Sequence, residues 1–192
     1  MFDTCVILAA GKSKRFGGCV PKLLVKLRDK PLIQYVIEYW KPSVNRFVFV
    51  VGYKSGEVID AISRIPMTKN AGFVFQPEQK GIADAILQSK RFVDGKFIVA
   101  LGDCLQNGLI KYPDDFDIGF EMGCGVWKDC SVFDEISRSY TTFVNDDKIY
   151  RVVEKPFLPD EIYGAYCGMG TYVFTPVVFD YIVKSLPSIC VP

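Results

Sequence analysis

The fold of this chain is indicated most strongly by a segment near its start, Val6-Ile7-Leu8-Ala9-Ala10-Gly11-Lys12-Ser13-Lys14-Arg15. Its first five residues are apolar without alternation, which is typical of a strand buried on both faces of a parallel sheet. The glycine then opens a turn of small residues and cations. Backbone N–H groups of such a turn can surround an anion, and the cations supply charge that a polyphosphate needs. The spacing matches neither the Walker P-loop nor the dinucleotide-binding fingerprint, so a solvated basic turn remains the alternative.

Strands and helices alternate downstream of this segment. Apolar runs predict buried strands at 47–51, 73–75 and 97–101, and helices are expected at 31–41, 58–62 and 81–90. This rhythm predicts an α/β fold with a doubly wound, mostly parallel Rossmann-like sheet and helices on both faces. Three strands end in glycine followed by polar residues, at 11–12, 52–54 and 102–103. Ligands bind beyond the carboxyl ends of such strands, so we expect one crevice there.

The pattern changes at about residue 114. Strands are expected at 118–126, 142–144, 149–153 and 169–174, without long helices between them, and a last helix is expected at 176–184. The turn signal at 145–147 predicts a hairpin. We therefore expect an antiparallel extension of the sheet in the second half, while 124–140 is left unassigned. The 192 residues are interpreted as one domain with halves 1–113 and 114–192.

Composition excludes several classes of function. Lys and Arg number 23 and Asp and Glu 22, so bulk charge gives no reason to expect nucleic acid or an anionic membrane as partner. No apolar run approaches the length of a membrane span, and the start of the chain is interpreted as a strand, not a secretory signal. We expect a cytoplasmic protein.

The seven cysteines and the absence of histidine narrow the chemistry further. Without histidine, nucleophiles activated by a neighbouring histidine are excluded. The cysteine spacing contains no Cys-x-x-Cys pair, so reduced, mostly buried thiols are a better interpretation than a zinc site.

Asp103 is the first candidate for chemistry outside the loop. It follows a buried strand and a glycine, and a carboxylate in that place suits Mg²⁺, which takes one or two carboxylates plus phosphate oxygens. The alternative is a helix cap for residues 105–110.

Two further segments have a functional and a structural interpretation. Gln76 carries a donor and an acceptor, which suits bidentate recognition of a base edge, and Gly81 allows close backbone contact; a polar loop with an N-cap is the alternative. Glu154 and Lys155 follow a predicted strand, and taken alone they form an ordinary surface ion pair.

Together these segments resemble the signature of the sugar nucleotidyltransferases, also called nucleoside-diphosphate-sugar pyrophosphorylases and including glucose-1-phosphate thymidylyltransferases. The matching elements are Leu8-Ala9-Ala10-Gly11 with Arg15, Pro21-Lys22-Leu23-Leu24, Gln76 with Gly81-Ile82-Ala83-Asp84-Ala85, Leu101-Gly102-Asp103 and Glu154-Lys155-Pro156. A weaker match is the segment 163–171, which resembles the strand of the family that faces the sugar.

The resemblance implies a role for each matching residue. Nucleotide binding is assigned to Leu8, Ala10, Gly11, Lys12, Ser13, Gln76 and Gly81, and catalysis to Arg15, Lys22, Asp103 and Lys155. Sugar phosphate binding is assigned to Glu154, Lys155 and Gly168, and Mg²⁺ is expected on Asp103.

The expected reaction joins an NTP, with a pyrimidine favoured, and a sugar 1-phosphate to give an NDP-sugar and pyrophosphate. Two departures bear on it. Thr141 stands where many relatives have a glycine that contacts the sugar, and the segment that carries the family's second metal-binding aspartate is not found in 1–192. A nucleotide-sugar-binding regulatory domain without turnover, and transfer to a non-sugar phosphorylated acceptor, are therefore the alternatives. A homo-oligomer is left open.

Overall fold

The structure, a computed structural model, describes residues 2–12, 19–106, 121–125, 140–146, 148–162 and 166–185. The chain forms two compact units. The first unit comprises residues 1–121 and 172–192, and the second comprises residues 122–171. The predicted functional residues of the loop and of the first-half strands belong to the first unit, and those of the second half belong to the second.

The first unit is built on a parallel sheet. Its central strand β1 (Phe2–Ala9) pairs in parallel with β4 (Val44–Val51) on one side and β6 (Phe97–Leu101) on the other, and β4 pairs in parallel with β5 (Gly72–Phe75). The strand order is β5-β4-β1-β6, with β10 (Tyr166–Phe174) next to β6. The predicted parallel sheet and its four strands are confirmed.

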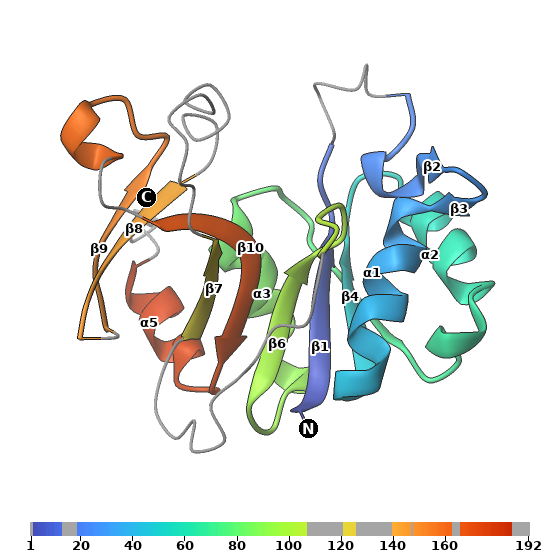
Figure 1. Cartoon of the computed structure of the whole chain (residues 1–192). Helices are drawn as coiled ribbons and strands as arrows, with labels where there is room; N and C mark the ends of the chain where they lie inside the picture. Colours follow the sequence, from blue (N-terminus) through green and yellow to red (C-terminus); the bar gives the residue numbers. More distant parts are fainter. Residues whose placement is uncertain are drawn as a thin grey trace, which may run out of the picture. The chain divides into compact units, whose positions relative to one another are not determined.

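Helices cover both faces of this sheet, as predicted (Figure 1). On one face lie α1 (Leu32–Trp40) and α2 (Ser55–Ser63), and on the other lie α3 (Ile82–Gln88) and α5 (Val178–Ser185). The short elements are β2 (Lys26–Leu27), β3 (Lys30–Pro31), η2 (Lys22–Leu24), η3 (Lys41–Ser43), η4 (Pro66–Thr68), η5 (Lys90–Phe92) and η7 (Pro159–Glu161). The predicted helix at 105–110 falls mostly outside the described residues.

Alternate residues of each strand build two separate cores, because successive side chains of a strand point to opposite faces. One core contains Ile7, Phe49, Ile37, Trp40 and Ile62. The other contains Val6, Val50, Val99, Ile86 and Phe179. Burial on both faces explains why the strands are apolar without alternation in the sequence.

The second unit is antiparallel, as expected. Strand β8 (Tyr140–Asn145) pairs with β9 (Lys148–Glu154) and with β10, both antiparallel, and β7 (Glu121–Gly125) also pairs with β10. The predicted hairpin turn lies between β8 and β9. Asp146 in this turn has φ 47°, a left-handed conformation that Asp tolerates better than most residues.

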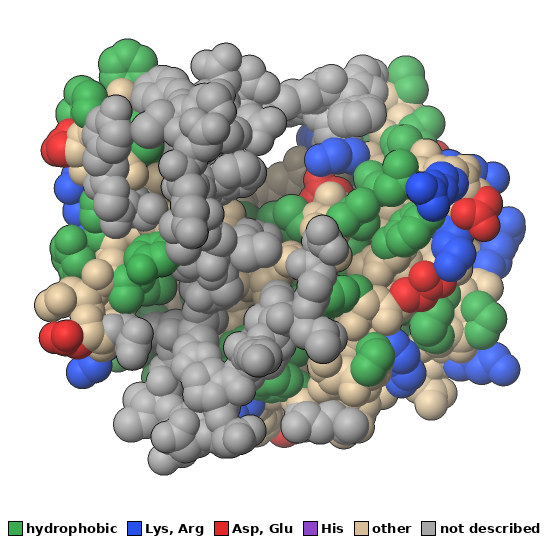
Figure 2. All heavy atoms as spheres, viewed as in Figure 1, with side chains coloured by type: hydrophobic (Ala, Val, Ile, Leu, Met, Phe, Trp, Pro, Cys, Tyr) green, Lys and Arg blue, Asp and Glu red, His purple; other side chains and the backbone are tan. Residues whose placement is uncertain are grey.

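Charges of both signs are interleaved on the surface. Figure 2 shows Lys and Arg beside Asp and Glu over α1 and the β2–β3 pair, and Lys30 Nζ lies 2.9 Å from Glu38 Oε1 there. This agrees with the near-zero net charge of the sequence. Among the described residues, no helix is long and apolar enough to cross a membrane.

Gly52 fixes the contact between the end of β4 and the end of β1. A Cβ on Gly52 would lie 2.9 Å from Ala10 Cβ and 3.2 Å from Ala10 O, and the Tyr53 N–H donates to Ala10 O at 3.3 Å. The backbone carrying the predicted phosphate-binding loop therefore rests directly on Gly52.

We expect Gly52→Ala to lower the free energy of unfolding by about 1–3 kcal/mol, because overpacking against backbone cannot relax easily. Gly56→Ala is the matched control, since nothing lies within 4 Å of its added Cβ and it sits in α2. Alanine in a helix is favoured by about 0.5–1 kcal/mol over glycine, so this variant should be slightly stabilised. Urea unfolding of the two variants measures the difference, and an equal effect would contradict the proposed contact.

Candidate active site

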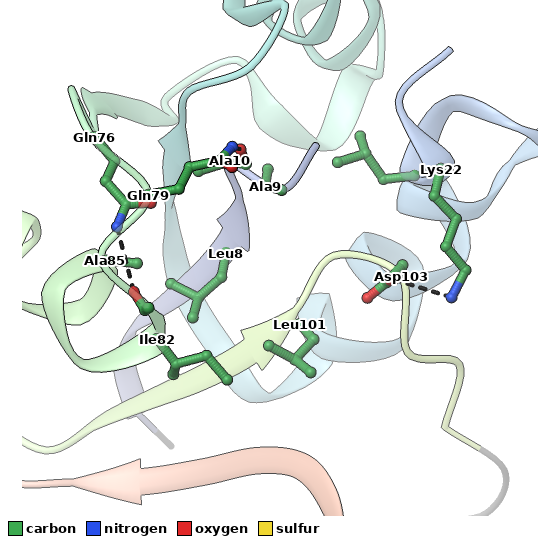
Figure 3. Close-up of a pocket in the computed structure, with 13 residues that line it drawn as sticks. Leu8, Ala9, Ala10, Lys22, Gln76, Gln79, Ile82, Ala85, Leu101 and Asp103 are labelled. Carbon is green, nitrogen blue, oxygen red and sulfur yellow. Dashed lines mark hydrogen bonds and ion pairs between the residues drawn. The ribbon is translucent and has the colours of Figure 1, made fainter. Parts of the chain in front are cut away.

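A pocket of about 270 Å³ lies in the first unit, beyond the carboxyl ends of β1 and β6 and beside the start of α3. Its lining residues are Leu8, Ala9, Ala10, Gly11, Lys22, Leu23, Gln76, Gln79, Gly81, Ile82, Ala85, Leu101 and Asp103. Figure 3 shows Lys22 and Asp103 on one side and Gln76 and Gln79 on the other, with Leu8 and Leu101 between them. The pocket thus joins a charged end to an end that carries amides.

Seven residues that the sequence assigned to nucleotide binding, catalysis or the metal line this pocket together: Leu8, Ala10, Gly11, Lys22, Gln76, Gly81 and Asp103. Lys12 is exposed and is not among the lining residues. Ser13 and Arg15 lie outside the described residues. The end of β4, expected in the crevice, instead packs behind Ala10 through Gly52.

The charged end is formed by an ion pair. Asp103 follows β6 after Gly102, whose N–H donates to Leu8 O at 2.9 Å and so ties the ends of β6 and β1. Lys22 opens the short helix η2, and its Nζ lies 3.0 Å from Asp103 Oδ2. The two side chains are 38% and 37% exposed, so a ligand entering the pocket can reach both.

Cys104, the neighbour of Asp103, does not offer a nucleophile. Burial raises the pKa of its thiol, the Asp103 carboxylate raises the pKa further, and Lys22 opposes this. A thiolate is therefore disfavoured beside the ion pair. Cys5, Cys19, Cys104 and Cys167 are all free thiols, and Cys5 and Cys167 are buried.

At the other end Gln76 is 4% exposed, and three hydrogen bonds hold the residue, one from its backbone and two from its side chain. Its backbone N–H donates to Val51 O at 2.8 Å, and its Nε2 donates to Asp84 Oδ2 at 2.6 Å and to Gly81 O at 3.3 Å. Gly81 precedes α3 with φ 101°, a conformation open to glycine but strained for other residues. The backbone turn at Gly81 therefore brings Asp84 back to Gln76.

Sequence reasoning assigned no role to six of the lining residues: Ala9, Leu23, Gln79, Ile82, Ala85 and Leu101. Gln79 Nε2 donates to Ala10 O, which links the amide end of the pocket to the end of β1. A second glutamine three residues after Gln76 was a usable signal. The pair Ile82 and Ala85 has the spacing of one helix face, which was also visible in the sequence.

The second unit carries the residues assigned to the sugar phosphate. Glu154 is exposed at the end of β9, and in the register of the two strands it lies opposite Tyr140 of β8. The Tyr140 ring also covers Gly168 of β10, since a Cβ added to Gly168 would clash with Tyr140 Cζ. Glu154 and Gly168 thus lie on either side of Tyr140. Lys155 is exposed with φ 51°, an uncommon backbone conformation outside glycine.

Thr141 is part of the fold of the second unit. It is 2% exposed, and its Oγ1 donates to Glu161 O at 2.8 Å. Thr141, which stands where many relatives have a glycine, therefore spends its hydroxyl donor on a backbone carbonyl of the same unit.

Known proteins match both the sequence and the fold. UTP–glucose-1-phosphate uridylyltransferase AglF of Haloferax volcanii is 31% identical over 91% of this chain and 72% of its own length. The bifunctional protein GlmU of Methanococcus maripaludis is 27% identical over 95% of this chain, which spans only 43% of that relative.

Solved structures show the same fold. A UDP-glucose pyrophosphorylase complexed with UDP-glucose superposes with a TM-score of 0.71 at 22% identity, covering 96% of this chain and 80% of that protein. The inositol-1-phosphate CTP transferase of T. maritima superposes with a TM-score of 0.70 at 22% identity, covering 93% and 73%. The family model of the MobA-like NTP transferase domain matches residues 5–107, the part of the chain that includes every residue of the pocket. With this match and the identity to AglF, the chain belongs to the MobA-like NTP transferase family.

Proposed function

We propose that this chain joins an NTP, with a pyrimidine favoured, and a sugar 1-phosphate to give an NDP-sugar and pyrophosphate. The observation that carries the proposal is the pocket itself. One cavity is lined by the Lys22–Asp103 ion pair at one end and by Gln76 and Gly81 at the other. A nucleoside triphosphate needs such a site, because its phosphates and its base belong to one molecule and must be bound together. The names of the matching relatives, including a UTP–glucose-1-phosphate uridylyltransferase, support the same activity.

In the proposed reaction a phosphate oxygen of the sugar 1-phosphate attacks the α-phosphorus of the NTP. A new P–O bond forms as the bond between the α-phosphorus and the bridging oxygen breaks, and pyrophosphate leaves opposite. No protein group becomes covalently modified, so positioning and charge stabilisation provide the catalysis. Leu8, Ala10, Gly11, Lys12 and Ser13 are assigned to the nucleotide, with Arg15 on the triphosphate.

Lys22 is assigned to the α-phosphate, where negative charge increases during the attack. Its Nζ already lies at the charged end of the pocket, 3.0 Å from the Asp103 carboxylate. A cation there needs little reorganisation when the phosphate charge develops, which is the condition for effective electrostatic catalysis.

Asp103 is proposed to hold Mg²⁺. The described residues contain no group of three or more carboxylate, cysteine or histidine ligands, so protein groups would fill only part of the coordination shell of the metal. One carboxylate is sufficient for Mg²⁺ when substrate phosphates and water complete its octahedral shell. When bound, the metal supplies charge that neutralises the phosphates. The chain's own contribution is to hold the carboxylate at the end of β6.

The sugar phosphate is assigned to Glu154, Lys155 and Gly168. Glu154 offers a carboxylate to sugar hydroxyls, and the exposed Lys155 offers a cation to the attacking phosphate. The halves 1–113 and 114–192 are proposed to serve the nucleotide and the sugar within one domain. A cytoplasmic location is also proposed, because free thiols are typical of a reducing compartment.

The test measures pyrophosphate release by the purified chain with UTP, dTTP, CTP, GTP and ATP, each combined with several sugar 1-phosphates and with phosphorylated alcohols. Release that needs a sugar 1-phosphate supports the proposal. Binding of nucleotide sugars without any release would favour a regulatory domain, and release only with a phosphorylated alcohol would favour a non-sugar acceptor. Either of these results contradicts the proposed reaction.

A further inference from the structure

The Gln76 amide has no donor left to offer a ligand. Its Nε2 carries two hydrogens and faces two acceptors, Asp84 Oδ2 at 2.6 Å and Gly81 O at 3.3 Å. An ionised carboxylate and a backbone carbonyl can only accept hydrogen bonds. The nitrogen must therefore be the atom that faces them, which fixes which end of the amide is oxygen.

Gln76 Oε1 is consequently the atom that remains for the pocket. Gln76 is one of the lining residues, and no protein partner of its Oε1 is found in the part of the chain that the structure describes. The sequence suggested bidentate reading of a base edge by this side chain. The contacts instead leave Gln76 only its Oε1 for a ligand, so the side chain can accept a hydrogen bond from a base but cannot donate one.

Asp84 imposes this orientation. It lies on α3, eight residues after Gln76, and its other oxygen accepts from Gln88 Nε2 at 3.3 Å. Gln88 therefore steadies the carboxylate on the same helix, one turn further along. If the carboxylate became an amide, its NH₂ group would be able to donate to Gln76 Oε1, and the Gln76 amide would be free to turn its nitrogen into the pocket.

We propose that Asp84 is a positioning residue for base selection: it holds Gln76 with Oε1 toward the pocket, so that the site prefers a base with an imide N–H. The inference rests on the proposed function only in taking the pocket as the nucleotide site. Uracil and thymine offer an N3–H donor at the centre of their pairing edge, whereas cytosine presents an acceptor there. An oxygen that meets the cytosine N3 is repelled, and a buried polar group left unpaired is costly. Guanine also presents an N–H donor, N1–H, at the centre of its pairing edge, so the test includes it.

The experiment measures nucleotide binding by titration calorimetry, independently of turnover. UTP, dTTP, CTP, GTP and N3-methyl-UTP are titrated into the wild type, Asp84→Asn and Gln88→Ala. For the wild type we expect binding of UTP and dTTP about 10-fold or more tighter than binding of CTP and of N3-methyl-UTP. For Asp84→Asn the ratio of UTP to CTP affinity should fall to within about 3-fold of unity, because both amide orientations become available.

Gln88→Ala is the matched control. It removes a hydrogen bond to Asp84 but leaves the Gln76–Asp84 contact, so its UTP to CTP ratio should stay near that of the wild type. Asp84→Ala is the second variant if Asp84→Asn does not fold, and it too should lose selectivity. A purely structural role for Asp84 would lower the melting temperature and weaken binding of every nucleotide alike, with an unchanged ratio.

The outcomes separate this proposal from the proposed reaction. Selective UTP binding that depends on Asp84, without pyrophosphate release, would leave the role of Asp84 standing and overturn the reaction. GTP binding as tight as UTP binding would also support recognition of a central N–H donor by Gln76 Oε1, and it would remove the preference for pyrimidines. Wild-type binding of CTP as tight as that of UTP, or a ratio that survives Asp84→Asn, would overturn the proposal.

Discussion

Asp103→Asn is expected to lower the rate of Mg²⁺-dependent pyrophosphate release by about 10²–10³-fold, the loss seen when one preorganised charge-stabilising group is removed from an active site. The substitution keeps the shape of the side chain and removes its charge. Asparagine can still accept a hydrogen bond from Lys22 but is a weak ligand for Mg²⁺, which prefers carboxylate oxygens. The change should act on turnover far more than on the fold.

Asp94→Asn is the matched control for this prediction. Asp94 also belongs to the first unit and also pairs with a cation, at 3.6 Å from Arg46 Nη2, but it is not among the residues of the pocket. Both ion pairs are partly or largely exposed, and exposed pairs contribute about 0–1 kcal/mol to stability. Both variants should therefore melt close to the wild type, and only Asp103→Asn should lose turnover. Rapid Mg²⁺-dependent release by Asp103→Asn would show that the metal is held elsewhere.

The architecture of the first unit was predictable because its strands are buried on both faces. Val6 and Ile7 are neighbours in the sequence and belong to different cores, so an uninterrupted apolar run is required at β1. The pocket was also largely predictable. Candidate ligand-binding residues follow directly after β1 and β6, and parallel strands bring their carboxyl ends to the same edge.

The side-chain partners inside the pocket were not predictable in the same way. The link from Gln76 to Asp84 exists only because Gly81 adopts φ 101° and turns the chain back at the start of α3. A sequence pattern shows that glycine permits this conformation but does not show which atoms it brings together. For the same reason the pattern suggested a bidentate Gln76, whereas in the structure the donors of its amide are bonded inside the protein.

The residues proposed for the sugar phosphate illustrate the same limit in the second unit. The hairpin of β8 and β9 followed from its turn signal, but the cover of Gly168 by the Tyr140 ring depends on the register between β8 and β10. A shift by one residue would turn every side chain of a strand to the other face. Sequence alone placed Glu154 and Gly168 in one region without showing that Tyr140 lies between them.

Lys22→Met is expected to lower turnover about 10²–10³-fold, because the α-phosphate would lose the cation that stabilises its developing charge. The same variant should bind a divalent cation more tightly in the absence of nucleotide. Lys22 Nζ lies 3.0 Å from Asp103 Oδ2, so the ammonium group and the metal compete for one carboxylate. Both side chains are more than a third exposed, which limits the gain in metal affinity to about 3–10-fold.

Two measurements test this prediction: Mn²⁺ titration of the nucleotide-free protein followed by electron paramagnetic resonance, and the rate of pyrophosphate release. Lys30→Met is the matched control, since Lys30 pairs with Glu38 at 2.9 Å with side-chain exposures of 36% and 31%, close to those of Lys22 and Asp103. Neither Lys30 nor Glu38 lines the pocket, so metal affinity and turnover should both stay near the wild-type values.

The opposite signs of the two effects distinguish a catalytic role for Lys22 from a structural one. Partial unfolding or a collapsed pocket would weaken metal binding and turnover together, because in the proposed mechanism both depend on Asp103 at the end of β6. Tighter metal binding with slower turnover can arise only if the pocket stays intact and Lys22 stabilises a charge, that of the α-phosphate, for which the bound metal cannot substitute. Lys22→Met with normal turnover and a lowered melting temperature would instead assign the lysine to the fold. The developing charge of the α-phosphate would then have to be stabilised by a group other than Lys22.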